Sequence, residues 1–217
     1  MTEPTEPTAN PARDDSKVSI GGWQPVGGAT IRAVPSMSDQ FYRLAKNLRD
    51  LSRQHAGDIS LPAGTVVIAI AALEAYVNEL AEMALRDSNR RDFHALRDNL
   101  IKKLQLLNER GQNPGELESD VEEDIALLYG FRGKLMHYRA DAEHPVDTST
   151  SLQRLVTRFP KAIASGADVS TDQLLTPHLA EWAVDRVTEA IKGLYQCGWE
   201  PPRPRWLELV DPGRLAK

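Results

Sequence analysis

The chain has 217 residues, of which 41% are hydrophobic and 26% are charged, and this length and composition fit one globular domain with tails. Its formal net charge of −5 at pH 7 argues against binding to nucleic acid through overall charge, although a local basic patch could still do so. The single cysteine, Cys197, excludes an internal disulfide and a cysteine-rich zinc site, and it fits a reducing compartment.

The first 35 residues contain five prolines and show no sustained apolar period, so residues 1–35 are expected to form a disordered N-terminal arm. This segment lacks the basic and apolar regions of a secretory signal. The longest apolar run, residues 66–73, is far shorter than the ~20 residues that a membrane span requires. These features predict a cytoplasmic protein without membrane contact.

Apolar residues at spacings of three and four predict helices over residues 36–196. The first expected helix begins near Ser36 or Ser38, either of which can cap it, and ends near Gln54. Its apolar stripe consists of Phe41, Leu44, Leu48 and Leu51. The second expected helix has Ser60 as its cap and continues to about Asp87. Its predicted core seam consists of Val66, Ile70, Leu73, Val77, Leu80 and Ala84.

A third helix is expected over about residues 91–110, before a loop rich in Gly, Asn and Pro. Its inward residues are Phe93, Leu96, Leu100, Leu104 and Leu107. A fourth helix is expected over about residues 118–140. It begins with acidic residues and ends with basic ones, as the helix macrodipole favours. Its core face consists of Ile125, Leu128, Phe131 and Leu135.

A short helix is expected near residues 151–159, and a last long helix over about residues 176–195. The inward residues of the last helix are Leu179, Trp182, Ala183, Val187 and Ile191. Residues 197–217 are Pro-rich and are expected to form a tail. The chain shows no repeat of fixed period and no strand-like alternation. We therefore predict an all-α fold, an antiparallel bundle of four to five main helices over residues 36–196.

The common templates of catalytic and metal sites are absent from the sequence. It contains no Gly-rich phosphate loop, no His-Glu-x-x-His zinc motif and no nucleophile elbow. His94 and His178 have no partner at metal-ligand spacing, and His137 with His144 would make a two-histidine site on a loop without cysteine. We therefore expect neither a metal site nor a cofactor.

One segment near the end of the fourth expected helix, residues 127–138, has Arg132 and His137 five positions apart. Arginine stays charged and can bind phosphate oxygens through two parallel hydrogen bonds. Histidine, with an unperturbed pKa of ~6.5, can exchange protons at neutral pH. The neighbouring candidates for substrate binding are Lys134, Tyr138 and Arg139. For Tyr138, stacking on a base and packing in the core are both open.

Positions five apart on a straight helix point about 140° away from each other. Arg132 and His137 therefore share a site only if the helix loosens near His137, which Gly133 favours, or if they face different walls of one cleft. Glu74 and Asn78 lie four positions apart, on one face of the second expected helix. We expect them to hold Arg132 through a carboxylate pair and an amide hydrogen bond.

Each of these residues also has a plain structural interpretation. Glu74 and Asn78 could form a solvated face beside the core seam. The arginine could form a surface salt bridge, for example with Asp124 or Glu79. The histidine could be stabilised by the negative end of the helix macrodipole at the helix C-terminus.

The Arg-x4-His spacing of Arg132 and His137, the polar residues of segment 72–79 and the order of the helices resemble the HEPN superfamily of small helical proteins, including its RiboL-PSP and toxin-like members. The resemblance implies a HEPN-like bundle and metal-independent RNA cleavage, without a cofactor, that leaves 2′,3′-cyclic phosphate and 5′-OH ends. Such proteins usually act as homodimers whose signature helices meet at a shared cleft. Many are toxins or anti-phage defence effectors with an antitoxin or defence partner.

The resemblance also implies a role for each site residue. Arg132 would stabilise the phosphate, His137 would act as general acid and base, and Glu74 and Asn78 would support them. One departure matters: Gly133 stands where the family usually has a polar residue, most often Asn. This departure leaves open an alternative of another class, a non-catalytic helical module that binds RNA or another protein.

Overall fold

The computed structural model describes residues 37–115, 117–136, 154–155, 158 and 171–199. Several predicted segments lie outside these residues: the N-terminal arm, the tail beyond residue 199, the continuation of the fourth helix to residue 140, and most of the short helix near 151–159. Within the described ranges every regular element is a helix, which confirms the prediction of an all-α fold.

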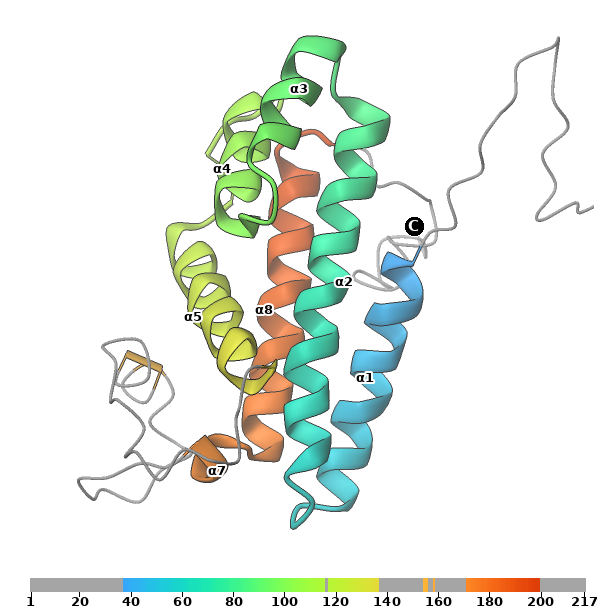
Figure 1. Ribbon diagram of the computed structural model, residues 1–217, viewed down its shortest axis with the longest axis vertical. Coiled ribbons are helices and arrows are strands. Elements are labelled where there is room, and N and C mark those ends of the chain that lie inside the picture. Colours follow the sequence, from blue (N-terminus) through green and yellow to red (C-terminus); the bar gives the residue numbers. More distant parts are fainter. Residues whose placement is uncertain (1–36, 116, 137–153, 156–157, 159–170, 200–217) are drawn as a thin grey trace, which may run out of the picture. The chain divides into compact units, whose positions relative to one another are not determined.

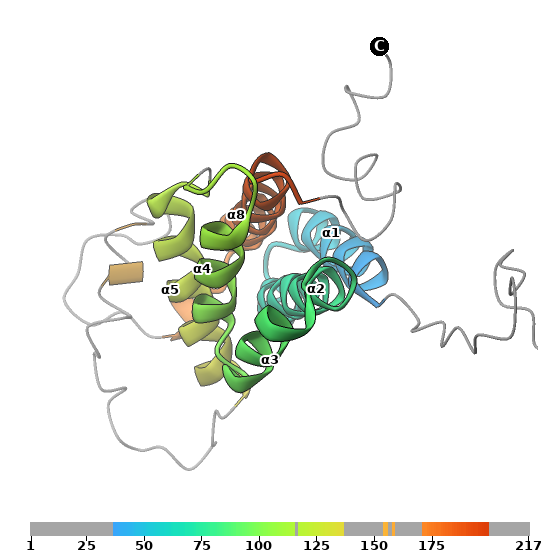
Figure 2. The same cartoon turned by 90° about the horizontal axis from the view of Figure 1, so that it is seen from above.

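The helices of the described residues are α1 (Ser38–Gln54), α2 (Ser60–Ala84), α3 (Asp87–Ala95), α4 (Leu100–Arg110), α5 (Ser119–Met136), α7 (Thr171–Leu174) and α8 (Pro177–Gln196). Among them, α1, α2, α5 and α8 form a bundle in which α2 and α8 lie in the middle, with α1 on one side and α5 on the other (Figure 1). The chain runs down α1 and α5 and up α2 and α8, so each outer helix is antiparallel to the two central helices it contacts. The view from above shows α4 beside α5 and α3 beside α2 (Figure 2).

The core seam predicted for the second helix is confirmed on α2. Five of its six residues are fully buried, and only Ala84, in the last turn, is exposed. The helix is apolar on most of its surface because it contacts α1, α5 and α8. By length and composition α2 could also cross a membrane, and 50% of its most apolar 18-residue window is buried inside the domain.

The apolar stripe of α1 is not the buried face of this helix. Leu44 and Leu51 are 44% and 41% exposed, and Phe41 and Leu48 are only partly buried. The buried face consists instead of Ser38, Tyr42, Ala45 and Ser52. The hydroxyl of Tyr42 hydrogen-bonds to Thr188 on α8, and the small side chains around it allow α1 to lie close to the two central helices.

The two predicted serine caps are replaced by carboxylates. Neither Ser38 nor Ser60 caps its helix with its hydroxyl, and Ser36 lies outside the described residues. At the start of α1, Glu79 of α2 accepts the backbone N–H groups of Ser38 (3.2 Å) and of the preceding residue (2.9 Å), and also the Ser38 hydroxyl (2.6 Å). At the start of α2, Asp58 accepts the N–H and the hydroxyl of Ser60, and these bonds lower the pKa of Asp58. A carboxylate suits both places because it binds unpaired N–H groups at the positive end of a helix dipole.

The substitution Glu79→Gln is expected to lower the free energy of unfolding by about 1 kcal/mol. The amide keeps one accepting oxygen but loses the second one and the negative charge at the N-terminus of α1. Urea denaturation followed by circular dichroism measures the loss. Glu123→Gln, at an exposed position of α5, is the matched control and should change stability by less than ~0.5 kcal/mol. Equal losses in the two variants would contradict the capping role of Glu79.

The third predicted helix is interrupted. α3 ends at Ala95 and α4 begins at Leu100, and between them Arg97 has a left-handed backbone with φ 50°. A non-glycine residue in this region ends a helix, and a new cap follows at once, because the side chain of Asn99 accepts the N–H of Lys102 at 3.0 Å. Of the predicted inward residues, Leu96 is partly buried, and the buried ones are Phe93, Leu100, Leu104 and Leu107.

The described parts of the last two long helices agree with the sequence prediction. Thr176 caps α8 by accepting the N–H of Leu179 at 3.3 Å. Leu135 and Trp182 are partly buried, and the other predicted inward residues of α5 and α8 are buried. After α8, the indole N–H of Trp199 donates to the carbonyl of Leu107 at 2.8 Å, which joins the end of α8 to α4.

Candidate functional site

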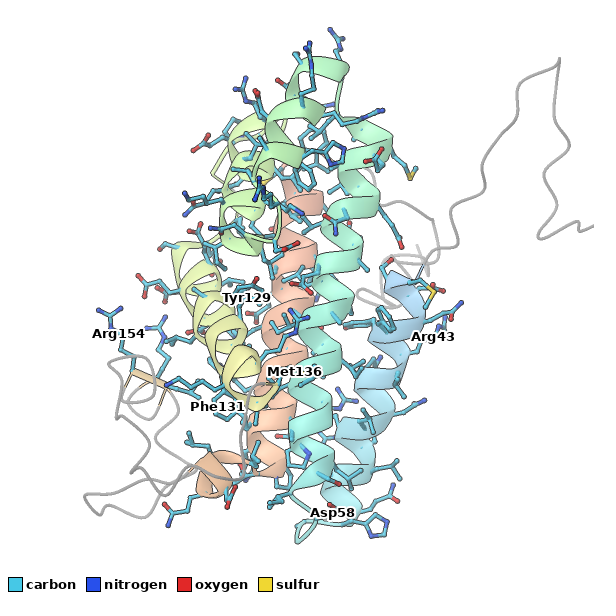
Figure 3. All side chains as sticks on the ribbon, viewed as in Figure 1. Arg43, Asp58, Tyr129, Phe131, Met136 and Arg154 are labelled. Carbon is cyan, nitrogen blue, oxygen red and sulfur yellow. The ribbon has the colours of Figure 1, made fainter. Side chains whose placement is uncertain are left out.

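A pocket of about 310 Å³ lies between α2, α4 and α5, beside the turn that joins α3 to α4. It is lined by Glu74, Asn78, Asp98, Leu100, Lys103, Tyr129 and Arg132. Three residues selected from the sequence, Glu74, Asn78 and Arg132, therefore line one pocket, although α2 and α5 are far apart in the chain. Figure 3 labels Tyr129 on α5, at mid-height of the bundle. The volume is at the lower end of the range for small-ligand sites.

The centre of the pocket is an ion pair between α5 and α2. The Nη1 of Arg132 donates to Oε1 of Glu74 at 2.8 Å, and each side chain is 26% exposed. The guanidinium also lies 5.9 Å from the centre of the Tyr129 ring, within the range of a cation–π contact. The Nε of Arg132 is buried and has no hydrogen-bond partner among the described residues. The arginine is thus held from one side, and it retains a buried donor that the described fold does not satisfy.

Asn78 does not make the hydrogen bond to Arg132 that was expected. Its Oδ1 accepts instead from Nζ of Lys103 on α4, at 2.9 Å. The same ammonium lies 4.9 Å from the centre of the Phe93 ring. The two residues predicted to act together on α2 therefore bind different cations. Glu74 binds Arg132 of α5, and Asn78 binds Lys103 of α4.

Tyr129 connects α5 to the wall of the pocket. Its hydroxyl donates to the backbone carbonyl of Asp98 at 2.6 Å. Burial raises the pKa of Tyr129 above its ordinary value, and the negative charge of Glu74 raises it further, against an opposite effect of Arg132. The phenol therefore stays protonated at neutral pH and acts as a donor.

The formal charges of the pocket balance. Arg132 and Lys103 are cations, and Glu74 and Asp98 are anions. The other salt bridges considered for the arginine do not form, because Asp124 pairs with two other arginines and Glu79 caps α1. A balanced pocket with two fixed cations can bind one phosphate group, but it is not the strongly basic groove of a protein that binds a long nucleic acid.

The second half of the signature is not described. His137, Tyr138 and Arg139 lie outside the described residues, and α5 is described as far as Met136, which is 61% exposed. Lys134 is partly buried and does not line the pocket. Of the signature, the structure therefore describes Arg132 and its surroundings in the pocket.

Three pocket residues were missed from the sequence: Asp98, Lys103 and Tyr129. Tyr129 lies three positions before Arg132 and so shares its helix face, a signal that was present in the sequence. Lys103 follows Lys102 near the start of α4, and nothing local in the sequence relates it to Asn78. Asp98 reaches the pocket only because the helix is interrupted beside it.

No metal-binding cluster occurs in the part of the chain that the structure describes, where no three His, Cys, Asp or Glu side chains gather at ligand distances. Of the two acidic residues that line the pocket, Glu74 binds a guanidinium. The described pocket therefore offers hydrogen-bond donors and cations for a ligand.

The described residues do not require a glycine at position 133. A Cβ atom added there would meet none of them within 4 Å, whereas one added at Gly193 of α8 would lie 2.9 Å from Leu117 Cδ1 and 3.2 Å from Leu117 Cα. We expect Gly133→Ala to raise the free energy of unfolding by about 1 kcal/mol, because alanine stabilises a helix interior. We expect Gly193→Ala to lower it by about 1–3 kcal/mol through overpacking. Urea denaturation of both variants measures these effects, and destabilisation by Gly133→Ala would indicate a contact with residues outside the described ranges.

Comparisons of the chain with protein-family models, with curated proteins and with solved structures give no match.

Proposed function

We propose that this protein is a metal-independent endoribonuclease of HEPN type that acts as a toxin or an anti-phage defence effector. One observation carries the proposal. Arg132 of the signature pairs at 2.8 Å with Glu74, the helix residue selected with it from the sequence, inside a pocket that Asn78 also lines. This ion pair joins α2 to α5, and the resemblance to the HEPN superfamily implies that residues of these two helices form one site.

On this proposal the reaction is a transesterification. The ribose 2′-oxygen attacks phosphorus and loses its proton, the bond to the 5′-oxygen breaks, and that oxygen gains a proton. The products are a 2′,3′-cyclic phosphate and a 5′-OH end. His137 exchanges the protons, and Arg132 stabilises the charge that builds on the phosphate oxygens.

The pocket offers further support for binding the phosphate and its neighbours. Lys103 supplies a second cation, and Tyr129 offers an aromatic ring and a protonated hydroxyl beside Arg132. Glu74 fixes the direction of the guanidinium, because one of its N–H groups is already bound. A bound and directed arginine needs less reorganisation when charge develops on the phosphate.

A homodimer completes the proposed site. One histidine cannot easily act as both acid and base within a single step, and a two-fold pairing of α5 helices would bring two copies of Arg132 and His137 together. The exposed side chain of Met136, on the described end of α5, offers an apolar contact for this pairing.

The decisive experiment is RNA cleavage in EDTA by the purified full-length chain. We expect the wild type to cleave RNA without added metal and to leave cyclic phosphate ends, and we expect His137→Ala to abolish cleavage. His178→Ala is the matched control, because His178 is 66% exposed on α8 and does not line the pocket. A requirement for magnesium, or cleavage that survives in His137→Ala, would show that the mechanism is wrong.

The second candidate is a non-catalytic helical module that binds RNA or protein. Two observations favour it: the glycine at position 133 and the balanced charge of the pocket. On this reading the wild type binds RNA or a protein partner in EDTA without forming product. If RNA is the ligand, Arg132→Ala weakens binding. RNA cleavage that depends on His137 would exclude a non-catalytic module.

A further inference from the structure

The exposed large hydrophobic residues of the described chain gather on one side of the bundle. Six such residues are exposed, and five lie within α1 or α2 or directly before one of them. These five are Met37, Leu44 and Leu51 at 41%, 44% and 41%, Ile59 at 45% and Met83 at 65%. The sixth is Met136. A concentration of exposed apolar residues on one face is typical of an interaction surface.

On α1 these residues belong to a continuous seam, here called the α1 stripe. It consists of Met37, Phe41, Leu44, Leu48 and Leu51. Their spacing of four, three, four and three is that of a helix that packs against another helix. At 100° per residue the stripe is centred about 90° away from the buried side of α1, so the core leaves it largely uncovered.

Of the neighbouring helices, α2 borders the stripe along one edge. A Cβ at Gly64 of α2 would lie 3.5 Å from Cδ1 of Leu48, so this leucine packs over the glycine. The other edge is formed by Gln40, Asn47 and Gln54, which are exposed and uncharged. The nearest charges beyond them, Arg43 and Asp50, have opposite signs and lie symmetrically about the middle of α1. A face with these properties matches a second copy of itself turned by 180°, because no like charges meet.

We infer that the α1 stripe is the contact surface for a second copy of this chain, with the two α1 helices antiparallel about a two-fold axis near residues 46 and 47. In this register Phe41 faces the partner's Leu51, and Leu44 faces the partner's Leu48. The two copies of Asn47 lie beside the axis. The Met37 end of one copy approaches the Ile59 end of the other, which extends the apolar contact beyond α1.

The length of the seam sets the strength of the contact. α1 has 17 residues and is about 26 Å long, so the seam is short for a helix pair. We therefore expect weak, concentration-dependent association rather than a permanent dimer.

This contact is independent of the proposed ribonuclease site. α1 and α5 lie on opposite sides of the central helices, as the view along the bundle shows (Figure 2). Pairing through α1 therefore leaves the pocket of Arg132 open, and it differs from the pairing through α5 that the proposed mechanism needs. An experiment that disproves one of these two contacts therefore does not disprove the other.

Sedimentation equilibrium of the full-length chain tests the inference. Because pairing through α5 would add a second association, the measurement uses the Met136→Glu background, an apolar-to-acidic change on α5 that leaves the α1 contact intact. In this background we expect a monomer–dimer equilibrium between about 1 and 200 µM, and we expect Leu44→Glu with Leu51→Glu to weaken it at least ~10-fold. A monomer at ~200 µM in this background would overturn the inference and assign the stripe to another occupant. A dimer that persists with Leu44→Glu and Leu51→Glu alone but not with Met136→Glu would overturn it in favour of α5.

Oxidative cross-linking tests the register without disturbing the apolar seam. We expect Asn47→Cys to form a disulfide-linked dimer, because the two copies of position 47 meet at the axis. Lys46→Cys, one position along and about 100° around the helix, is the control and should cross-link far more slowly. The native Cys197 is fully buried and does not interfere. Equal cross-linking of the two variants, or none in Asn47→Cys, would contradict the two-fold contact.

Discussion

Arg132→Ala is expected to slow RNA cleavage by about 100- to 1000-fold while leaving the fold intact. On the proposed mechanism its guanidinium stabilises the charge that develops on the scissile phosphate, and removing one such donor has an effect of about this size. The ion pair with Glu74 is 26% exposed on each side, so its loss should change the free energy of unfolding by at most ~1 kcal/mol. Single-turnover rates, measured with enzyme in excess, report the chemical step.

Arg132→Lys tests whether the site needs only a positive charge or also the planar geometry of the guanidinium. Lysine keeps the positive charge, but one ammonium cannot bind Glu74 and also present two parallel N–H groups to a phosphate. We therefore expect this variant to recover only a small part of the lost rate. A rate equal to that of the wild type would show that the site needs a point charge and not the arginine fork.

Glu74→Gln tests whether Glu74 acts only by positioning Arg132. We expect about a 10-fold loss of rate in the wild-type background and no further loss in the Arg132→Ala background, since the group to be positioned is then absent. The pH profile of the rate should keep its shape, because the carboxylate does not carry the transferred proton. A shifted profile, or additive losses in the double variant, would contradict a positioning role.

Asp124→Ala is expected to lower the free energy of unfolding by about 2–3 kcal/mol and the melting temperature by about 4–10 °C. Asp124 of α5 is 3% exposed and binds two arginines, Nε of Arg158 at 2.9 Å and Nη1 of Arg186 at 3.5 Å. Removing the carboxylate leaves both guanidiniums without this partner. Because those side chains are 38% and 25% exposed, water compensates part of the loss, and the expected effect is below that of a fully buried pair.

Asp120→Ala is the matched control for this prediction. Asp120 lies one turn earlier on α5 and pairs with the same Arg158 at 3.4 Å, but it is 71% exposed. It should change stability by less than ~0.5 kcal/mol. Thermal unfolding of the two variants side by side separates a buried anchor from a surface ion pair. A loss in Asp124→Ala no greater than in Asp120→Ala would contradict the anchoring role.

The α1 helix shows what apolar period alone leaves undecided. Its period predicted the helix and its last residue correctly, but Leu44 and Leu51 of its apolar stripe are exposed. The residues that enter the core, Tyr42 and Ala45, do not form the most apolar stripe. Period alone cannot choose between two faces when the buried one is built from a tyrosine and small residues that fit a groove between two other helices.

The candidate site also combines a contact that the sequence predicted with one that it did not. Glu74 and Arg132 were paired from a helix spacing and a motif, and this pairing is present in the structure. The role of Asn78 was not predictable, because Lys103 reaches it only after a left-handed residue interrupts the preceding helix and turns α4 toward α2. Contacts within one helix follow from spacing, but contacts between helices depend on how the connecting turns direct them.

The sequence by itself determined that this protein is helical, where most of its helices lie, and that the core seam of α2 runs from Val66 to Leu80. These features follow from the spacing of apolar residues, which is local information. Only the tertiary structure decided that Glu79 caps α1, that α3 and α4 are separate helices, that a pocket forms around Arg132 and Glu74, and that the apolar stripe of α1 is left exposed. The cap, the pocket and the exposure of the stripe depend on side chains that are distant in sequence and close in space, and such contacts are decided by packing. The break between α3 and α4 depends on a left-handed backbone at Arg97, which the spacing of apolar residues does not reveal.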